Sequence, residues 1–226
     1  MPLLADPSGL TQDGGDGEDP ADAEGLAAVP CSGALHSLLE AAYSSWTYDS
    51  FALAAASQGH PLSALLYFLL HRSGLMTRFR LDPLMTARFA RALEAGYQDQ
   101  PYHNKIHAAD VLQTLHVVLT RGGLVPGYAD PLTLLACLLA GAAHDLQHSG
   151  LTNDFLVATE HPLALLYNDN LSLGAAGRAH WSDCRSPAEN HHLATLFSML
   201  RCPELALLAH LPKQERDKMR KIIIEL

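Results

Sequence analysis

Residues 130–148 read DPLTLLACLLAGAAHDLQH, an Asp-Pro pair followed by an apolar run that ends directly at a histidine and an aspartate. Proline fits the first turn of a helix, so Pro131 marks a predicted helix start. The apolar run, 132–143, has twelve residues, whereas a membrane-spanning helix needs about 20. We therefore predict a buried helix of a globular domain, with His144 and Asp145 at its end, and no membrane span.

A helical pattern continues over most of the chain from Leu35 onward. In 61–73 the leucines recur at intervals of three and four residues, which is the spacing of one face of a helix. Several segments begin at a proline or end before a glycine, and both are helix-boundary signals. Because no alternating strand pattern and no internal repeat occurs, the predicted fold class is all-α. The predicted helices are 61–73, 83–95, 103–120, 131–143, 153–159, 162–167, 187–201 and 212–226.

Composition divides the chain into a tail and one domain. Residues 1–30 are rich in glycine, proline, alanine and acidic side chains and cannot bury enough apolar area to fold, so we expect a disordered acidic tail. Docking to a basic partner is an alternative role for this tail. Residues 31–226 form the predicted domain, whose size is ordinary for one domain. Within it, 171–185 is rich in glycine, alanine and serine without a coherent period, which predicts a loop insertion.

Charge and cysteine content argue against several classes of protein. The formal net charge of −9 argues against a nucleic-acid-binding protein, whose surface should carry a basic stripe. The four cysteines lie far apart and form no zinc-finger spacing, so we expect reduced thiols in a cytoplasmic protein. The first residues lack the basic segment of a signal peptide, which agrees with this compartment.

Histidine is unusually frequent, with thirteen in the chain, and four of them form two spaced pairs. The first pair lies in YHNKIHAAD, residues 102–110, where His103 and His107 are four positions apart. On a helix the two rings would share one face. Asp110, one turn further, could hold the other nitrogen of the His107 ring, as outer carboxylates do in metal sites.

The second pair lies in HDLQH, residues 144–148, where His148 follows His144 by four positions and would again share its face. The adjacent Asp145 offers a carboxylate that can bridge two cations. Nitrogen and oxygen donors of this kind suit zinc together with magnesium or manganese. Two ions are a usual means of cleaving a phosphoester. A single histidine is more often a core or surface residue, but two such pairs with two aspartates favour a metal site.

A third cluster, ENHH at 189–192, opens the helix predicted after Pro187. Glu189 could orient a catalytic histidine. It could equally favour the N-terminus of the helix through the helix dipole. The local sequence leaves both interpretations open.

At these residues the chain resembles the class I 3′,5′-cyclic nucleotide phosphodiesterases. The matching strings are YHN (102–104), HAADV (107–111), HD (144–145) with His148, YND (167–169) and ENHH (189–192). Each string is short, but their order is specific, and the resemblance covers 35–226 apart from the insertion. Within the family the chain is most similar to the calmodulin-stimulated subgroup, through WTYDSFA (46–52), PYHNKIHAADVLQT (101–114) and LPKQERDKMRKIIIE (211–225).

The resemblance implies an all-helical catalytic domain of the histidine–aspartate phosphohydrolase type, with two divalent ions, zinc and magnesium or manganese. It implies hydrolysis of cAMP or cGMP to the 5′-monophosphate. His103 would be the general acid that protonates the leaving O3′, with Glu189 orienting its ring. Tyr102 would line the phosphate end of the pocket, and His148 would lie beside the attacking hydroxide. The implied metal ligands are His107, His144 and Asp145.

The sequence also departs from the family pattern. The last metal ligand of the family, an aspartate, and the glutamine and aromatic clamp that hold the purine have no counterpart up to Leu226. We therefore expect a partial catalytic domain with activity below that of a complete one, and exposed apolar residues at 222–226. No calmodulin-binding region is visible, because the N-terminal segment is acidic. The alternatives are a non-catalytic truncated form that acts through protein–protein contacts, and a hydrolase of another phosphoester, which the ordered strings disfavour.

Overall fold

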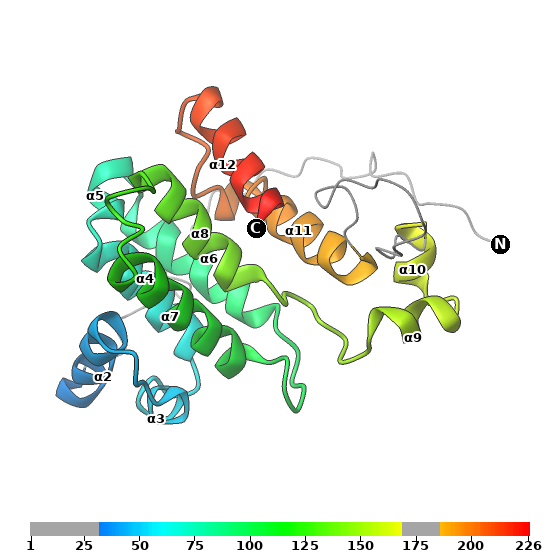
Figure 1. The fold of residues 1–226 in the computed structure, drawn as a ribbon, viewed down its shortest axis with the longest axis horizontal. Helices are drawn as coiled ribbons and strands as arrows, with labels where there is room; N and C mark the ends of the chain where they lie inside the picture. The colour runs from blue at the N-terminus through cyan, green and yellow to red at the C-terminus, as the bar shows by residue number, and fades with distance from the viewer. Residues whose placement is uncertain (1–31, 169–185) are drawn as a thin grey trace, which may run out of the picture. The chain divides into compact units, whose positions relative to one another are not determined.

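The computed structural model describes residues 32–168 and 186–226, which are the coloured parts of the ribbon (Figure 1). Within these ranges every regular element is a helix, and this confirms the all-α prediction. The predicted acidic tail, 1–30, and the predicted loop insertion, 171–185, lie outside the described residues. The helices are α2 (Gly33–Ser44), α3 (Ser50–Ala56), α4 (Pro61–Arg72), α5 (Leu75–Phe79), α6 (Pro83–Ala95), α7 (Lys105–Arg121), α8 (Pro131–Ala143), α9 (Asn153–Ala158), α10 (Pro162–Leu166), α11 (Pro187–Met199), the 3₁₀ helix η1 (Pro203–Leu205) and α12 (Lys213–Glu225).

Much of the core lies between the four helices α4, α6, α7 and α8. Figure 1 shows α7 and α8 side by side, and α4 packs against both α6 and α7. The leucines predicted for one face of α4 are buried, and α8 is buried on almost every side. Full burial of a leucine side chain is worth about 1.5–3 kcal/mol. The helices that carry the site are therefore held by the most buried part of the protein.

Glu94 of α6 is a buried carboxylate that caps the N-terminus of α4. Its side chain is 3% exposed and accepts hydrogen bonds from the backbone N–H groups of Leu62 and Ser63, at 2.9 and 3.2 Å. The hydroxyl of Ser63 and Nδ1–H of His60 also donate to the carboxylate, at 2.9 and 2.8 Å, and Nη1 of Arg91 donates at 3.4 Å. A negative charge at a helix N-terminus is favourable, because the first N–H groups of a helix have no partner within it. Local sequence could not reveal this capping role, since the capped residues and His60 lie 31–34 positions from Glu94.

The C-terminal helix α12 packs on α8. Asp130 caps α8 by accepting a hydrogen bond from the backbone N–H of Thr133. Its other carboxylate oxygen accepts a hydrogen bond from Nζ of Lys218 in α12 at 2.6 Å. Met219 and Ile223 are 1% and 2% exposed, and both belong to the core cluster. The expectation of an exposed apolar end is therefore wrong for Ile223, whereas Leu226 is 61% exposed. None of the helices in the described part of the chain combines the length and apolar character that crossing a membrane requires.

The predicted start of α7 requires a correction. The helix begins at Lys105 and not at His103, because Asn104 is its N-cap and accepts the backbone N–H groups of Ile106 and His107. Asparagine is among the most favoured N-cap residues. His103 therefore lies in the preceding loop, and the argument that it shares a helical face with His107 does not apply.

Candidate metal centre

The end of α8 presents His144 toward α7. His144 is the first residue after the helix, and its ring Nδ1–H donates to the carbonyl of Gly141 at 2.9 Å. In the neutral ring this bond leaves the lone pair on Nε2, as ring-orienting hydrogen bonds do in metal sites. A Cβ atom added at Gly141 would lie 2.8 Å from Cδ2 of Leu115, so α7 and α8 approach closely at this point. The glycine thus allows α7 to bring His107 within reach of His144.

Three donor atoms meet at this helix crossing. Nε2 of His107 lies 3.4 Å from Nε2 of His144 and 3.4 Å from Oδ2 of Asp145. Nε2 of His144 lies 3.1 Å from the same carboxylate oxygen. Donors bound to one tetrahedral zinc ion by bonds of about 2.0–2.1 Å are ~3.4 Å apart. The three residues therefore fit a divalent ion without rearrangement, and they could hold one.

The protonation states of these groups suit a cation. Burial lowers the pKa of His107, and the neighbouring charge of His144 lowers it further, so the ring is neutral and has a free lone pair. Burial alone would raise the pKa of Asp145. In its protonated form the His144 ring donates a hydrogen bond to this carboxylate and carries a charge, and these effects, followed by the charges of His148 and His103, outweigh burial and lower the pKa of Asp145 to about 2. The carboxylate is therefore ionised at neutral pH.

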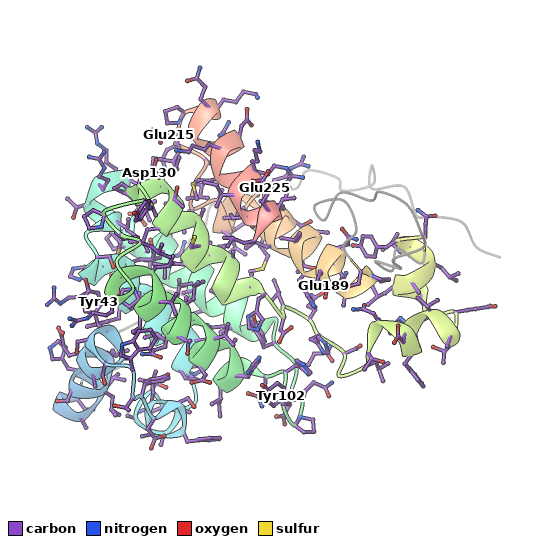
Figure 2. All side chains as sticks on the ribbon, viewed as in Figure 1. Tyr43, Tyr102, Asp130, Glu189, Glu215 and Glu225 are labelled. Carbon is purple, nitrogen blue, oxygen red and sulfur yellow. The ribbon has the colours of Figure 1, made fainter. Side chains whose placement is uncertain are left out.

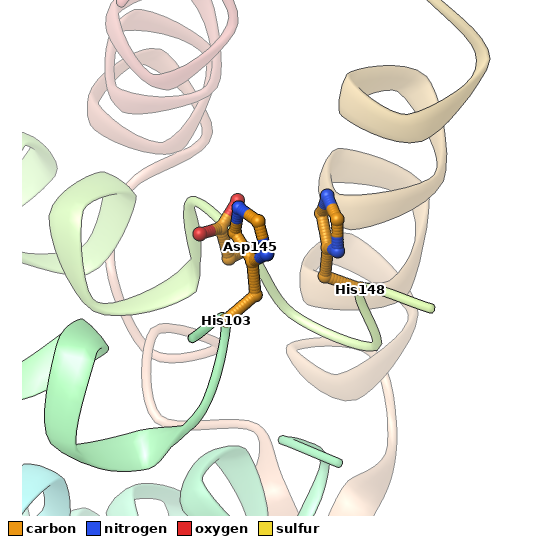
Figure 3. A group of neighbouring side chains, drawn as sticks. All are labelled: His103, Asp145 and His148. Carbon is orange, nitrogen blue, oxygen red and sulfur yellow. The ribbon is translucent and has the colours of Figure 1, made fainter. Parts of the chain in front are cut away.

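A second group of side chains shares Asp145. Figure 3 shows the rings of His103 and His148 beside this carboxylate, and the donor atoms of the three residues lie within 4.8 Å of one another. The two rings stack, with centroids 3.8 Å apart and planes 18° apart. Nδ1 of His148 accepts the backbone N–H of Gly150 at 2.9 Å, so the neutral ring carries its proton on Nε2. His148 is therefore better suited to donate a hydrogen bond than to bind a metal ion.

The histidines pair differently in the structure from the two pairs that the spacing predicted. The spacing predicted that His144 and His148 share a helical face, but the helix ends at Ala143 and the chain turns at Gln147, whose φ is +62°. His148 consequently stacks on His103, while His144 meets His107. Both ring contacts reach the turn after α8. His103 does so from the loop before α7, and His107 does so from the first turn of α7.

Two other predicted site residues, Glu189 and Tyr102, also lie near the centre (Figure 2). Glu189 does not bond to His103 and instead accepts Nδ2 of Asn153 at 3.4 Å. Its charge raises the pKa of His148, as a smaller influence than burial. Tyr102 is 63% exposed, and its ring centroid is 4.4 Å from that of His107. In Figure 2, Tyr102 lies in the loop before α7 and Glu189 on the first turn of α11.

Asp110 is also placed differently from the expectation. It is exposed, and among the hydrogen bonds of the described residues none joins it to His107. Its only effect on His107 is electrostatic, as the smallest of the influences that shift the pKa of this ring. The outer partner that we expected for His107 is therefore not Asp110 in this structure.

Two histidines of α11 hold the turn that carries Asp145. His192 is 4% exposed, and its ring Nδ1–H donates to the carbonyl of Leu146 at 2.6 Å. Burial lowers the pKa of His192 to about 4. Nε2 of His191 donates to Oε1 of Gln147 at 2.8 Å. The string ENHH pointed to this cluster, but nothing local could identify partners 44 and 46 positions away.

The centre borders a cavity of about 310 Å³ between α7, α8, α11 and α12. His144, Glu189 and His192 are its ionisable lining residues, and the others are mainly aliphatic. A larger cavity of about 560 Å³, lined by Glu94 and Lys105 among others, contains none of the site histidines. Of the three residues with converging donor atoms, His144 is the one that lines this smaller, mainly apolar space.

Comparison with known proteins places these features in a family. The sequence model described as 3′5′-cyclic nucleotide phosphodiesterase matches residues 102–226. The chain is 37% identical over 183 residues to the dual specificity calcium/calmodulin-dependent 3′,5′-cyclic nucleotide phosphodiesterase 1B of Mus musculus, covering 80% of this chain and 31% of the mouse protein. The corresponding phosphodiesterase 1 of Drosophila melanogaster is 37% identical, over 80% of this chain and 20% of its own length. The chain thus spans about a third or less of these relatives.

A solved structure shows the same fold. The phosphodiesterase domain of the RhoPDE fusion protein from Salpingoeca rosetta superposes with a TM-score of 0.63 at 28% sequence identity. The match covers 78% of this chain and 54% of that one. Over the matched part, the helical fold of this chain is therefore similar to that of a known phosphodiesterase domain.

Proposed function

The chain belongs to the family of 3′5′-cyclic nucleotide phosphodiesterases, and we propose that its metal centre opens the cyclic phosphate of cAMP or cGMP. The observation that carries the proposal is the convergence of His107, His144 and Asp145, with donor atoms 3.1–3.4 Å apart. The products are the 5′-monophosphates. Water supplies the oxygen that attacks phosphorus, and the bond from phosphorus to O3′ breaks.

Two divalent ions fit the donor chemistry. Two imidazole nitrogens and a carboxylate suit zinc, and the second oxygen of Asp145 suits magnesium or manganese, which prefer oxygen ligands. When bound, such a pair of ions supplies an activated water at neutral pH and neutralises the charge of the phosphate. His107, His144 and Asp145 would hold the first ion, and Asp145 alone of these would reach both.

His103 and His148 are proposed to handle the protons. His103 would donate its proton to O3′ as the P–O3′ bond breaks, so that the ribose leaves as a neutral hydroxyl. His148 presents an N–H group on the same side of Asp145 and would orient the attacking oxygen. Tyr102 would border the phosphate. Glu189 would act on this pair through the charge that it exerts on His148 rather than by a direct bond to His103.

The setting of the protein is also a proposal. Cys137 and Cys202 are free in the described part of the chain, which supports a reducing, cytoplasmic compartment. The net charge of −9 supports a small-molecule substrate rather than a nucleic acid. We propose no calmodulin-binding segment within this sequence.

A non-catalytic role in protein–protein contacts is the second candidate. Leu165 and Leu166 of α10 are 60% and 65% exposed, and Phe155 of the adjoining α9 is 51% exposed. Exposed apolar side chains in a group are typical of contact surfaces. This role does not require a metal ion, so metal-dependent turnover separates the two candidates.

The test is hydrolysis of cAMP and cGMP by the purified chain, with zinc and magnesium added and after removal by a chelator. We expect 5′-monophosphate to form only with metal present, and the variant His107→Ala to form none. Metal binding without turnover of either nucleotide would contradict the proposed activity and leave the protein-binding role in its place.

A further inference from the structure

The turn that carries Asp145 and His148 is bonded to α11 at two consecutive positions. The His192 ring donates to the carbonyl of Leu146 at 2.6 Å, and the His191 ring donates to Oε1 of Gln147 at 2.8 Å. The hydroxyl of Thr195, one turn along α11, lies 3.5 Å from the same Oε1. One backbone carbonyl and one side-chain oxygen of the turn are thus held by a single helix.

These hydrogen bonds hold a turn whose backbone conformation is unfavourable. Gln147 has a left-handed backbone with φ of +62°, which residues other than glycine adopt at an energetic cost. Leu146 and Gln147 lie directly between Asp145 and His148. Any drift of this turn would move the carboxylate away from the Nε2 atoms of His107 and His144.

The rings also stack across the turn. His192 lies 5.7 Å from His148 between centroids, with the planes 24° apart, and His148 lies 3.8 Å from His103. The three imidazoles form a column from α11, through the turn after α8, to the loop before α7. His192 is the buried end of this column and restricts the position of His148.

We propose that His191 and His192 are positioning residues of the metal centre, which hold the Leu146–Gln147 turn so that Asp145 and His148 face His107 and His103. The inference rests on the proposed function, because it concerns the same centre. Neither histidine is proposed to touch the ion or the substrate. Their effect reaches the site through the backbone of residues 145–148.

His116 provides a matched control. It is a fully buried histidine of α7, and its ring nitrogen Nε2 donates to the carbonyl of Tyr43 at 3.2 Å. His116→Ala therefore removes a buried ring and a bond to a backbone carbonyl, as His192→Ala does. Only the second change affects the turn after α8.

The experiment measures cobalt(II) affinity and the visible absorption of the cobalt-loaded chain. We expect His192→Ala to weaken cobalt binding by about 10- to 100-fold and to alter the spectrum, since loss of an outer-shell partner has effects of this size. His192→Asn, whose amide can donate to Leu146 in place of Nδ1, should recover most of the affinity. His116→Ala should melt at a lower temperature but keep the wild-type affinity and spectrum. His191 is only half-buried, so His191→Ala serves as a second test that should fold and should also weaken binding.

Wild-type affinity and spectrum in both His192→Ala and His191→Ala would overturn the inference. If the unmodified chain bound no cobalt, the proposed function would fail, and hydrogen exchange in the metal-free protein would then decide the inference by itself. Faster exchange of the 145–150 amides in His192→Ala than in His116→Ala would support the positioning role. Equal exchange in the two variants would refute it.

Discussion

The Nε2 atoms of His107 and His144 lie 3.4 Å apart, although the two residues are 37 positions apart in the chain. Nδ1 of His144 donates to Gly141, so the lone pair of its Nε2 faces His107. A cation held between the two Nε2 atoms would accept a lone pair from each ring. Asp145, at 3.1 and 3.4 Å from these nitrogens, adds the negative charge that a divalent ion requires.

The first prediction concerns metal binding. His144→Ala removes one of three donors, so zinc affinity should fall by more than the ~10- to 100-fold that is typical for an outer-shell partner. Isothermal titration of the metal-free chain measures this loss. His71→Ala, at an exposed position near the end of α4, should bind zinc like the unmodified chain. Equal affinities in the two variants would place the ion elsewhere.

The second prediction concerns proton transfer. His103→Ala should lower kcat for the cyclic nucleotide by ~10²–10⁴, the usual contribution of a general acid. Zinc affinity should remain, because His103 is not among the three converging donors. The exposed His36→Ala on α2 is the control and should leave kcat unchanged. If His103→Ala lost zinc affinity and activity together, His103 would be a metal ligand and not the general acid.

The third prediction concerns the buried carboxylate of Glu94. Glu94→Ala leaves the N–H groups of Leu62 and Ser63 and the ring of His60 without their acceptor. Each buried donor left without an acceptor costs about 1–3 kcal/mol, so urea denaturation should show a loss of at least this size. Glu40→Ala is the control, since its ion pair with Arg72 is 38% and 50% exposed and worth about 0–1 kcal/mol. Similar losses in both variants would contradict the capping role.

The fourth prediction concerns pH. Burial lowers the pKa of His116 in the folded chain, and the charge of Arg121 lowers it further, although the bond to the Tyr43 carbonyl acts in the opposite direction. The unfolded chain has a histidine pKa of about 6.5. As pH falls through this value, the unfolded state takes up a proton that the folded state does not, so the free energy of unfolding decreases.

The variant His116→Asn retains a donor for Tyr43 but does not titrate. In the presence of a chelator, its free energy of unfolding should depend less steeply on pH between about 7 and 5 than that of the unmodified chain. The slope should shrink without vanishing, because other histidines also have lowered pKa values. These are His107, His148, His191 and His192. An unchanged slope would show that His116 is protonated as easily in the folded state as in the unfolded state.

The helices themselves could be predicted because their signals are local. Asp82 and Asp130 cap α6 and α8 just before a proline, and both helices have the predicted bounds. A cap needs only a side chain and the N–H groups two or three residues ahead, so neighbouring residues contain the necessary information. The start of α7 was predicted wrongly although its cap signal is also local. The four-residue spacing of His103 and His107 suggested an earlier start and obscured the cap at Asn104.

The sequence by itself determined the residue types of the site, the all-helical fold and the order of the family strings. Only the tertiary structure decided which imidazole faces which, because one cap at Asn104 and one left-handed turn at Gln147 break the helical phase on both sides of the site. It also decided that α11 supports the turn after α8, through bonds that span 44 and 46 positions. Such contacts follow from how helices pack against one another, and the spacing of residues along the chain does not determine that packing.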